Sequence, residues 1–93
     1  MSKQLIRTNQ FKRDFKLIIK RGYDLTKFEK VLGYLISDTP LPLKYKDHQL
    51  AGNLRGIRDL HIEGDWLLLY ENNPNEITLH RTGTHTDIFK NIK

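Results

Sequence analysis

The chain has 93 residues, and its length, composition and charge exclude several classes of protein. Hydrophobic residues make up 38% and aromatic residues 10%, which is enough for one small core and too much for a disordered chain. We therefore expect a single domain over residues 1–93. Sixteen Lys and Arg against 11 Asp and Glu give a net charge of +5, which favours a polyanion or an acidic protein as the partner.

Cysteine is absent from the chain, which excludes disulfide frameworks, thiolate zinc sites and cysteine nucleophiles. The first residues lack the apolar stretch of a signal peptide. The longest apolar run, from Trp66 to Tyr70, is far shorter than a membrane span. The sequence therefore predicts a soluble, cytoplasmic protein.

The N-terminal part is predicted to form a short strand and an amphipathic helix. The strand covers residues 4–7, and Thr8 or Asn9 caps a helix that runs to about Arg21. The helix buries Phe11, Phe15 and Ile18, which recur at i, i+4 and i+7. Basic side chains fill its other faces, at Lys12, Arg13, Lys16 and Lys20.

A second helix is predicted after Gly22, which suits the left-handed position behind a helix end. Its cap is Asp24, or Thr26 in a capping box with Glu29. The stripe expected to be buried consists of Leu25, Phe28, Leu32 and Leu35. Two prolines, at positions 40 and 42, end the helical region, so the two helices are expected to form a hairpin.

The second half of the chain is predicted to contain a loop, three strands and a short tail helix. The loop covers residues 41–54 and the strands cover about 57–62, 66–71 and 76–81, whereas residues 86–92 form one or two helical turns. Together with the N-terminal strand, this order predicts an α+β fold with an antiparallel-rich sheet of about four strands and the helical hairpin on one face.

The register of the first hairpin decides which residues share a face. A three-residue turn that pairs Ile62 with Trp66 is preferred to a two-residue turn, because it places five apolar side chains on one face: Leu60, Ile62, Trp66, Leu68 and Tyr70. Asp59 and His61 then lie on the opposite face, with Asp65 nearby at the tip. Leu67 and Leu69 face that side too, and the 41–54 loop is expected to cover them.

Four histidines, at positions 48, 61, 80 and 85, carry the main chemical signal of the sequence. Histidine both gives and takes protons near neutral pH. Cleavage of RNA through its 2'-hydroxyl needs one group to remove a proton and another to protonate the departing 5'-oxygen. A cation must also meet the charge on the phosphorane, and Arg81 is the best placed by sequence.

Plainer interpretations exist for each of these residues. A single histidine is more often a solvated or core residue, and His80 is expected to be one. Arg58 and Asp59 form an ordinary surface pair in this reading, and Phe89 anchors the tail. A metal site made from Asp47, His48, His61, Asp65 and His85 is the chemical alternative, although the chain lacks the close His-x-x-x-His spacing typical of such sites.

Three motifs make the sequence resemble a known family. They are Tyr-Lys-Asp-His-Gln-Leu at residues 45–50, Gly-Ile-Arg-Asp-Leu-His-Ile-Glu-Gly-Asp-Trp at residues 56–66, and Arg-Thr-Gly-Thr-His at residues 81–85. In this order they resemble the YafQ-type mRNA interferase toxins of the RelE/ParE toxin superfamily. The resemblance implies a RelE-like fold, a toxin that cuts mRNA in the ribosomal A site without a cofactor, and a cognate antitoxin that silences it.

The resemblance also implies roles for individual residues. His85 looks like the proton donor, and His48, His61 and Asp65 are candidates for activating the 2'-hydroxyl. A tail helix starting at Thr86 would disfavour the acid role, so His85 as the base also stays open. The implied phosphate and substrate contacts are Arg81, Phe89, Arg58 and Lys46.

The basic helix gains a function under the same resemblance. Lys12, Arg13, Lys16, Lys20 and Arg21 are candidates for contacts with rRNA phosphates or with an acidic antitoxin segment. The alternative class is a ParE-like toxin that blocks DNA gyrase without cutting RNA, although such an inhibitor has no use for acid and base groups. A degenerate toxin that only binds its antitoxin is the third possibility.

Overall fold

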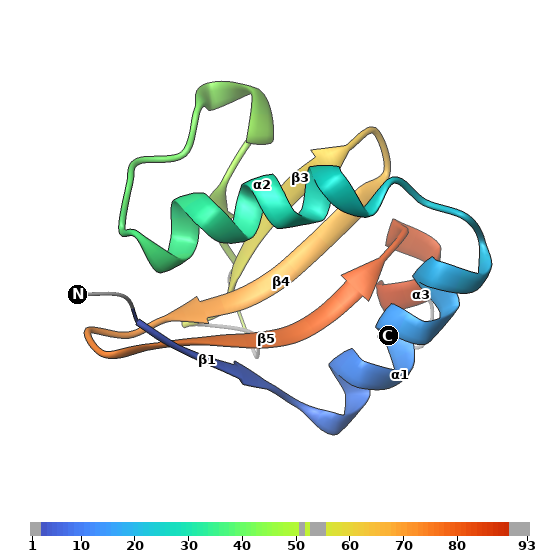
Figure 1. Cartoon of the computed structure of the whole chain (residues 1–93), viewed down its shortest axis with the longest axis horizontal. Helices are drawn as coiled ribbons and strands as arrows, with labels where there is room; N and C mark the ends of the chain where they lie inside the picture. Colours follow the sequence, from blue (N-terminus) through green and yellow to red (C-terminus); the bar gives the residue numbers. More distant parts are fainter. Residues whose placement is uncertain (1–2, 51, 53–55, 90–93) are drawn as a thin grey trace.

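The computed structural model describes residues 3–50, 52 and 56–89 and has the α+β fold expected from the sequence (Figure 1). No helix in these ranges is long and apolar enough to cross a membrane. The elements follow one another as β1 (Gln4–Arg7), α1 (Asn9–Lys20), α2 (Leu25–Ile36), the 3₁₀ turn η1 (Leu43–Tyr45), β2 (His48–Gln49), β3 (Arg58–Glu63), β4 (Trp66–Asn72), β5 (Glu76–Gly83) and α3 (His85–Phe89).

The sheet has five strands in the order β1-β5-β4-β3-β2. β1 runs parallel to β5, and the other neighbours are antiparallel. The sequence predicted about four strands, because β2 lies in the segment interpreted as a loop. A strand of two residues is too short to show an alternating pattern, and only its pairing with β3 identifies it.

Local signals in the sequence fix both N-terminal helices. The Thr8 side chain accepts a hydrogen bond from the Phe11 amide at 3.0 Å and caps α1. Gly22 has φ +79° behind the helix end, as expected. Asp24 rather than Thr26 caps α2, because its carboxylate accepts from the Thr26 amide and Thr26 already lies inside the helix. The alternative capping box with Glu29 is therefore wrong.

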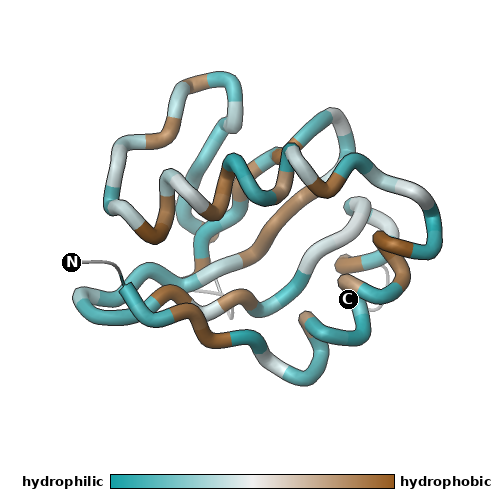
Figure 2. Tube along the Cα trace, viewed as in Figure 1, coloured by the Kyte–Doolittle hydropathy of each residue, from teal (hydrophilic) through white to brown (hydrophobic). Residues whose placement is uncertain are grey.

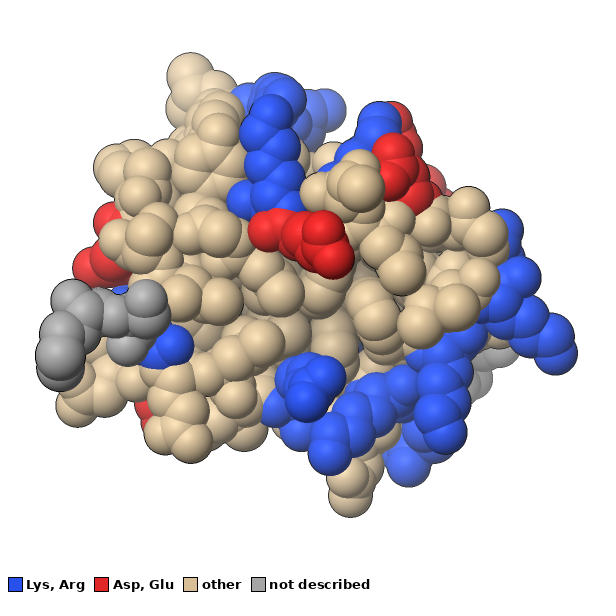
Figure 3. All heavy atoms as spheres, viewed as in Figure 1, with Lys and Arg blue, Asp and Glu red and all other residues tan. Residues whose placement is uncertain are grey.

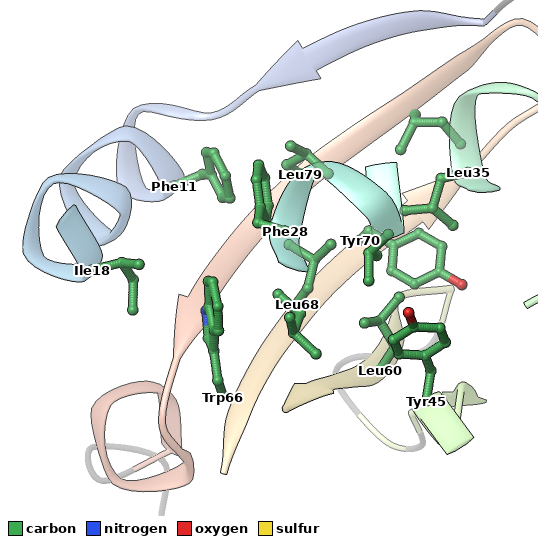
Figure 4. Packing of buried hydrophobic residues seen from close by; sticks show 13 residues of the cluster. Phe11, Ile18, Phe28, Leu35, Tyr45, Leu60, Trp66, Leu68, Tyr70 and Leu79 are labelled. Atoms are coloured by element: carbon green, nitrogen blue, oxygen red, sulfur yellow. The ribbon is translucent and has the colours of Figure 1, made fainter. Parts of the chain in front are cut away.

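The main core lies between these helices and one face of the sheet (Figure 4). Phe11 and Ile18 come from α1, and the rings of Phe11 and Phe28 lie 6.0 Å apart, which joins the two helices. In α2 the fully buried residue is Val31, whereas the expected Leu25 and Leu32 are only partly buried. The hydropathy trace shows β4 running through the centre of the molecule as an apolar strand (Figure 2).

The β3–β4 hairpin has a different register from the predicted one. Glu63 pairs with Trp66 and His61 pairs with Leu67, and the ladder is irregular between His61 and Glu63. The predicted pairing of Ile62 with Trp66 is therefore wrong, because Ile62 occupies a bulge. The bulge still lets Ile62 and Trp66 join the same core, so the predicted face is confirmed.

A second, smaller core covers the opposite face of the sheet. Leu67 and Leu69 are buried there together with Ile88 of α3. Leu50, Ile57 and Phe89 pack against them, so among the described residues the 41–54 segment contributes Leu50 to the cover and α3 contributes Ile88 and Phe89. The tail helix begins at His85 rather than Thr86, and residues 90–92 of its predicted range lie outside the described residues.

Candidate active site

The predicted catalytic residues gather on the sheet face that carries the second core. His48 of β2 pairs with Asp59 of β3 in the sheet. Asp59 pairs in turn with Leu69 of β4, and Leu69 pairs with Arg81 of β5. Paired residues project to the same side of a sheet. His61 follows two positions after Asp59 and therefore shares this face. Three strands and α3 thus contribute chemistry to one surface.

His85 and Asp65 are directly hydrogen-bonded at one end of this surface. The His85 Nδ1 atom bonds to Asp65 Oδ1, and the His85 backbone amide donates to the same oxygen at 3.2 Å. These hydrogen bonds lower the pKa of Asp65, so its carboxylate is charged and the Nδ1 of His85 must be the donor. The His85 ring lies 5.7 Å from that of His61 and 6.1 Å from that of Phe89.

The other two histidines are oriented by backbone carbonyls. His48 Nδ1 donates to the carbonyl oxygen of Lys46 at 2.8 Å, and His61 Nδ1 donates to that of Gly64 at 3.3 Å. A carbonyl only accepts, so the proton of each neutral ring sits on Nδ1. All three histidines therefore offer Nε2 for proton transfer.

Asp59 lies beneath these histidines and was not among the predicted site residues. Its residue is only 4% exposed, and its Oδ2 lies 3.6 Å from Nε2 of His48. Burial raises the pKa of Asp59, whereas the nearby charges of His48, His61 and His85 oppose that rise. Its Oδ1 has no hydrogen-bond partner within the described ranges. A buried carboxyl group next to three imidazoles is typical of a site that handles protons.

The interpretation of Arg58 and Asp59 as a surface pair is wrong, because Arg58 binds a different aspartate. Its Nη2 donates to Asp47 Oδ2 at 2.9 Å, and Tyr70 donates its hydroxyl to the other oxygen of Asp47 at 2.5 Å. This network fastens the segment that carries Lys46 and His48 to the sheet. The alternation that puts Asp59 on the same face as His61 was the available signal for its role.

Arg81 lies on β5, across the sheet from His48 on β2, and it is held in place by a residue of α1. Its Nε donates to Asp14 Oδ2 at 2.7 Å, and the same oxygen accepts from the Thr82 amide at 3.2 Å. Nothing in the sequence around either residue pointed to this pair. The contact with Asp14 fastens the end of β5 to α1. A phosphate that bound Arg81 would do so while Asp14 is also bound to it.

The basic residues of α1 form a charged surface beside the site. Lys12, Arg13, Lys16 and Lys20 are exposed, and basic side chains gather over α1 in the lower right of Figure 3. Arg21 differs from them, because its guanidinium donates to both carboxylate oxygens of Asp87 in α3. This ion pair holds the pKa of Asp87 well below its usual range and tethers the helix that begins with His85.

The five residues of the metal alternative do not form a ligand set. Within residues 3–50, 52 and 56–89, no group of three or more His, Asp or Glu side chains could hold a metal ion. Asp47 bonds to Arg58 and Tyr70, whereas His48 faces Asp59 instead. The imidazoles thus pair separately with carboxyl groups and carbonyls.

Comparisons with known proteins agree with this arrangement. Residues 3–90 match the family described as bacterial toxin of type II toxin-antitoxin system, YafQ. The mRNA interferase toxin YafQ of Escherichia coli K12 is 42% identical over 83 residues, which cover 88% of this chain and 90% of that protein. Among solved structures, the E. coli DinJ-YafQ toxin-antitoxin complex has a TM-score of 0.88 and 39% identity, covering 96% of this chain and 99% of the other.

A second solved structure, the metal-bound toxin from Helicobacter pylori, has a TM-score of 0.87 and 37% identity, with 96% of this chain and 100% of the other covered. The match to the family extends over nearly all of the chain, from β1 to the end of α3. It includes the three motifs from which the resemblance was inferred. The chain therefore belongs to the YafQ family of bacterial toxins of type II toxin–antitoxin systems.

Proposed function

We propose that this toxin is an endoribonuclease that cuts mRNA in the ribosomal A site, and that a cognate antitoxin inhibits it. The E. coli relative is named an mRNA interferase, and a related toxin is solved in complex with its antitoxin. The observation that carries the proposal is the gathering of His85–Asp65, His61 and His48–Asp59 on one sheet face. These groups supply the acid and base that attack by a 2'-hydroxyl requires, without a metal ion.

His85 is assigned as the general acid. The Asp65 carboxylate holds the proton on Nδ1 and balances the charge of the imidazolium, so Nε2 delivers its proton to the departing 5'-oxygen. This carboxylate also offsets the positive N-terminal end of α3, which had left the role of His85 open. A general acid of this kind typically accelerates cleavage by about 10²- to 10⁴-fold.

His48 is assigned as the general base. The Lys46 carbonyl fixes the tautomer in which Nε2 carries the lone pair, and Asp59 lies next to that nitrogen to stabilise the imidazolium. His61 is the second candidate, because its Nε2 is also unprotonated in the neutral ring. Asp65 is already engaged by His85, so it serves as an orienting group rather than the base.

Cationic and aromatic groups around the histidines position the substrate in this proposal. Asp14 engages Nε and Nη2 of Arg81, which leaves Nη1 to meet the charge on the phosphorane. Phe89 lies beside the His85 ring and offers a face to a base. Lys46 lies two positions before His48 and adds positive charge there, whereas Arg58 points to the other face of the sheet, toward Asp47 and Tyr70. Arg58 therefore acts in this proposal by fastening the segment that carries His48, and its expected contact with the substrate is replaced by that role.

Contacts of α1 with rRNA phosphates explain why cleavage depends on the ribosome in this proposal. The exposed Lys12, Arg13, Lys16 and Lys20 provide the positive surface, whereas Arg21 is occupied by Asp87. Such contacts weaken as salt rises. An acidic segment of the antitoxin would compete for the same surface.

The test is a comparison of His85→Ala with His80→Ala on ribosomes carrying a defined mRNA. His80 is the control, because it lies on β5 and its Nε2 bonds to Glu71, which is not among the proposed site residues. We expect mapped 5' ends to show cleavage by the parent and by His80→Ala, and its loss in His85→Ala. Normal cleavage by His85→Ala would remove the assigned acid.

The chemistry of the product ends tests the mechanism separately. Attack by the 2'-hydroxyl leaves a 2',3'-cyclic phosphate or 3'-phosphate and a 5'-hydroxyl. A 5'-phosphate, or loss of activity with a chelator that leaves ribosomes intact, would favour the metal alternative. Supercoiling defects without cleaved transcripts would instead identify a ParE-like inhibitor of gyrase.

A further inference from the structure

A hollow of about 460 Å³ lies between α2, η1 and the turn that joins β3 to β4. Binding pockets in proteins commonly have volumes of about 300–1,000 Å³. Four lysines line this one, with Lys27 and Lys30 from α2, Lys44 from η1 and Lys46 directly behind it. Basic side chains also gather near the top of Figure 3, around α2 and η1. We call this hollow the lysine pocket.

The charges of the lysine pocket favour an anion. Glu63 is the one acidic residue of its lining, and it forms an ion pair with Lys27. Within the described residues no ion pair holds the other three lysines, and the side chain of Lys44 lies over the Tyr45 ring with Nζ 5.2 Å from the centroid. Cations gathered in a concave surface concentrate positive potential and attract a negatively charged group.

The lysine pocket borders the histidine cluster and shares one residue with it. His61 lines the pocket, and its ring lies 5.7 Å from that of His85. Each nucleotide of an RNA strand adds one phosphate, so a strand whose scissile linkage lies at the histidines presents its neighbouring phosphate close to them. Lysine binds phosphate as a flexible point charge and reads no sequence.

We propose that the lysine pocket binds the backbone phosphate next to the linkage that is cut, with Lys30 and Lys44 as its main contacts. The inference rests on the proposed function, since it assumes that RNA lies across the histidines. An mRNA phosphate is favoured over an acidic side chain of the antitoxin because His61 belongs to both the pocket and the cluster. The lysines of the pocket position the strand and take no part in proton transfer.

The test measures single-turnover cleavage on ribosomes programmed with a synthetic mRNA, at increasing toxin concentration. The double variant Lys30→Gln/Lys44→Gln is expected to raise the half-saturating concentration about tenfold and leave the maximal rate nearly unchanged. Glu63→Gln should act in the opposite direction and lower that concentration, because it frees Lys27 from its ion pair.

Chemically neutralised phosphates identify the ligand. A methylphosphonate at the flanking linkage should weaken cleavage by the parent toxin and have little further effect in Lys30→Gln/Lys44→Gln, because both changes remove the same contact. The control Lys12→Gln/Lys16→Gln removes equal charge from α1, and its effect should add to that of the methylphosphonate at every position.

The proposal would be overturned if the effect of Lys30→Gln/Lys44→Gln simply added to that of a methylphosphonate at every flanking linkage. It would also be overturned by an unchanged half-saturating concentration combined with weaker antitoxin binding, which would assign the pocket to the antitoxin. The proposed function fails in a different way, because the parent toxin would then leave the unmodified mRNA intact in the same assay.

Discussion

The His85–Asp65 and His48–Asp59 pairs use the same residue types, yet their surroundings push the two carboxyl groups in opposite directions. Asp65 lies in an exposed turn, where two hydrogen bonds from His85 lower its pKa. Asp59 lies on a central strand, where burial raises its pKa. Environments that separate the pKa values of similar groups commonly separate an acid from a base.

The two pairs also differ in which ring nitrogen faces the carboxyl group and in how close it lies. His85 bonds directly to Asp65 through ring and backbone, whereas His48 Nε2 stays 3.6 Å from Asp59 and its Nδ1 is fixed by a carbonyl. In the proposed mechanism the first pair contains the imidazole that donates a proton, and the second contains the imidazole that accepts one. Two pairs of the same residue types therefore differ in burial and in the ring nitrogen that faces the carboxyl group, and the proposed division into acid and base rests on this difference.

The variant with the largest expected effect on the difference between the two pairs is Asp65→Asn. The amide keeps a hydrogen-bond acceptor for His85 and removes the charge that balances the imidazolium, so we expect cleavage on programmed ribosomes to slow about 100-fold. Because Asp65 is exposed, thermal unfolding and antitoxin binding should change little. A cleavage rate within twofold of the parent would show that the Asp65 charge does not support the acid.

Sequence patterns predicted the parts of the molecule that depend on neighbouring residues. The spacing of Phe11 and Ile18 placed the buried side of α1, and the alternation around His61 placed it on the face opposite Leu60. The three motifs identified the histidines that the structure brings to one surface. Such patterns follow from the period of a helix or strand, which a sequence displays directly.

The missed features depend on contacts between distant segments. Asp14 and Arg81 are 67 positions apart, and only the packing of α1 against β5 brings them together. The bulge at Ile62 and the two-residue strand β2 arise from pairing rather than from composition. The burial of Asp59 likewise depends on what covers the sheet, so its polar identity suggested an exposed residue.

Gly83→Ala should disturb the His85 side of the site and spare the His48 side. Gly83 has φ +150°, and a Cβ atom there would lie 3.0 Å from Asp87 Oδ2. Asp87 accepts from the Thr84 amide at the start of α3 and binds Arg21, so its displacement moves His85. We expect about 1–3 kcal/mol less stability and roughly tenfold slower cleavage, from chemical denaturation and single-turnover rates.

Gly33→Ala is the matched control for this glycine. Gly33 lies inside α2, and a Cβ atom there meets nothing within 4 Å. Alanine should therefore stabilise the helix by about 0.5–1 kcal/mol and leave cleavage unchanged. Equal behaviour of the two variants would contradict a special role for Gly83 in placing His85.

Asp47→Ala should disturb the His48 side in a corresponding way. It removes the acceptor of both Arg58 and the largely buried Tyr70 hydroxyl, which we expect to cost about 1–2 kcal/mol of stability. Loosening the segment next to His48 should slow cleavage about threefold, a smaller effect than that of Gly83→Ala. Tyr70→Phe removes only one hydrogen bond, and equal losses in both variants would show that Arg58 contributes nothing.

Asp59→Asn has the smallest expected effect, and it tests the difference between the two pairs through folding stability alone. Because the pKa of Asp59 is raised on folding, the unfolded chain ionises first, and folding stability is lost as pH rises through the ordinary aspartate range to the raised folded pKa. The penalty then persists at neutral pH. Asparagine lacks it, so the variant should gain about 1 kcal/mol at pH 7 and nothing below pH 3, measured by denaturation at both pH values. A variant less stable at pH 7 would mean that the His48 imidazolium already compensates the buried charge in the free toxin, and the two pairs would then be alike.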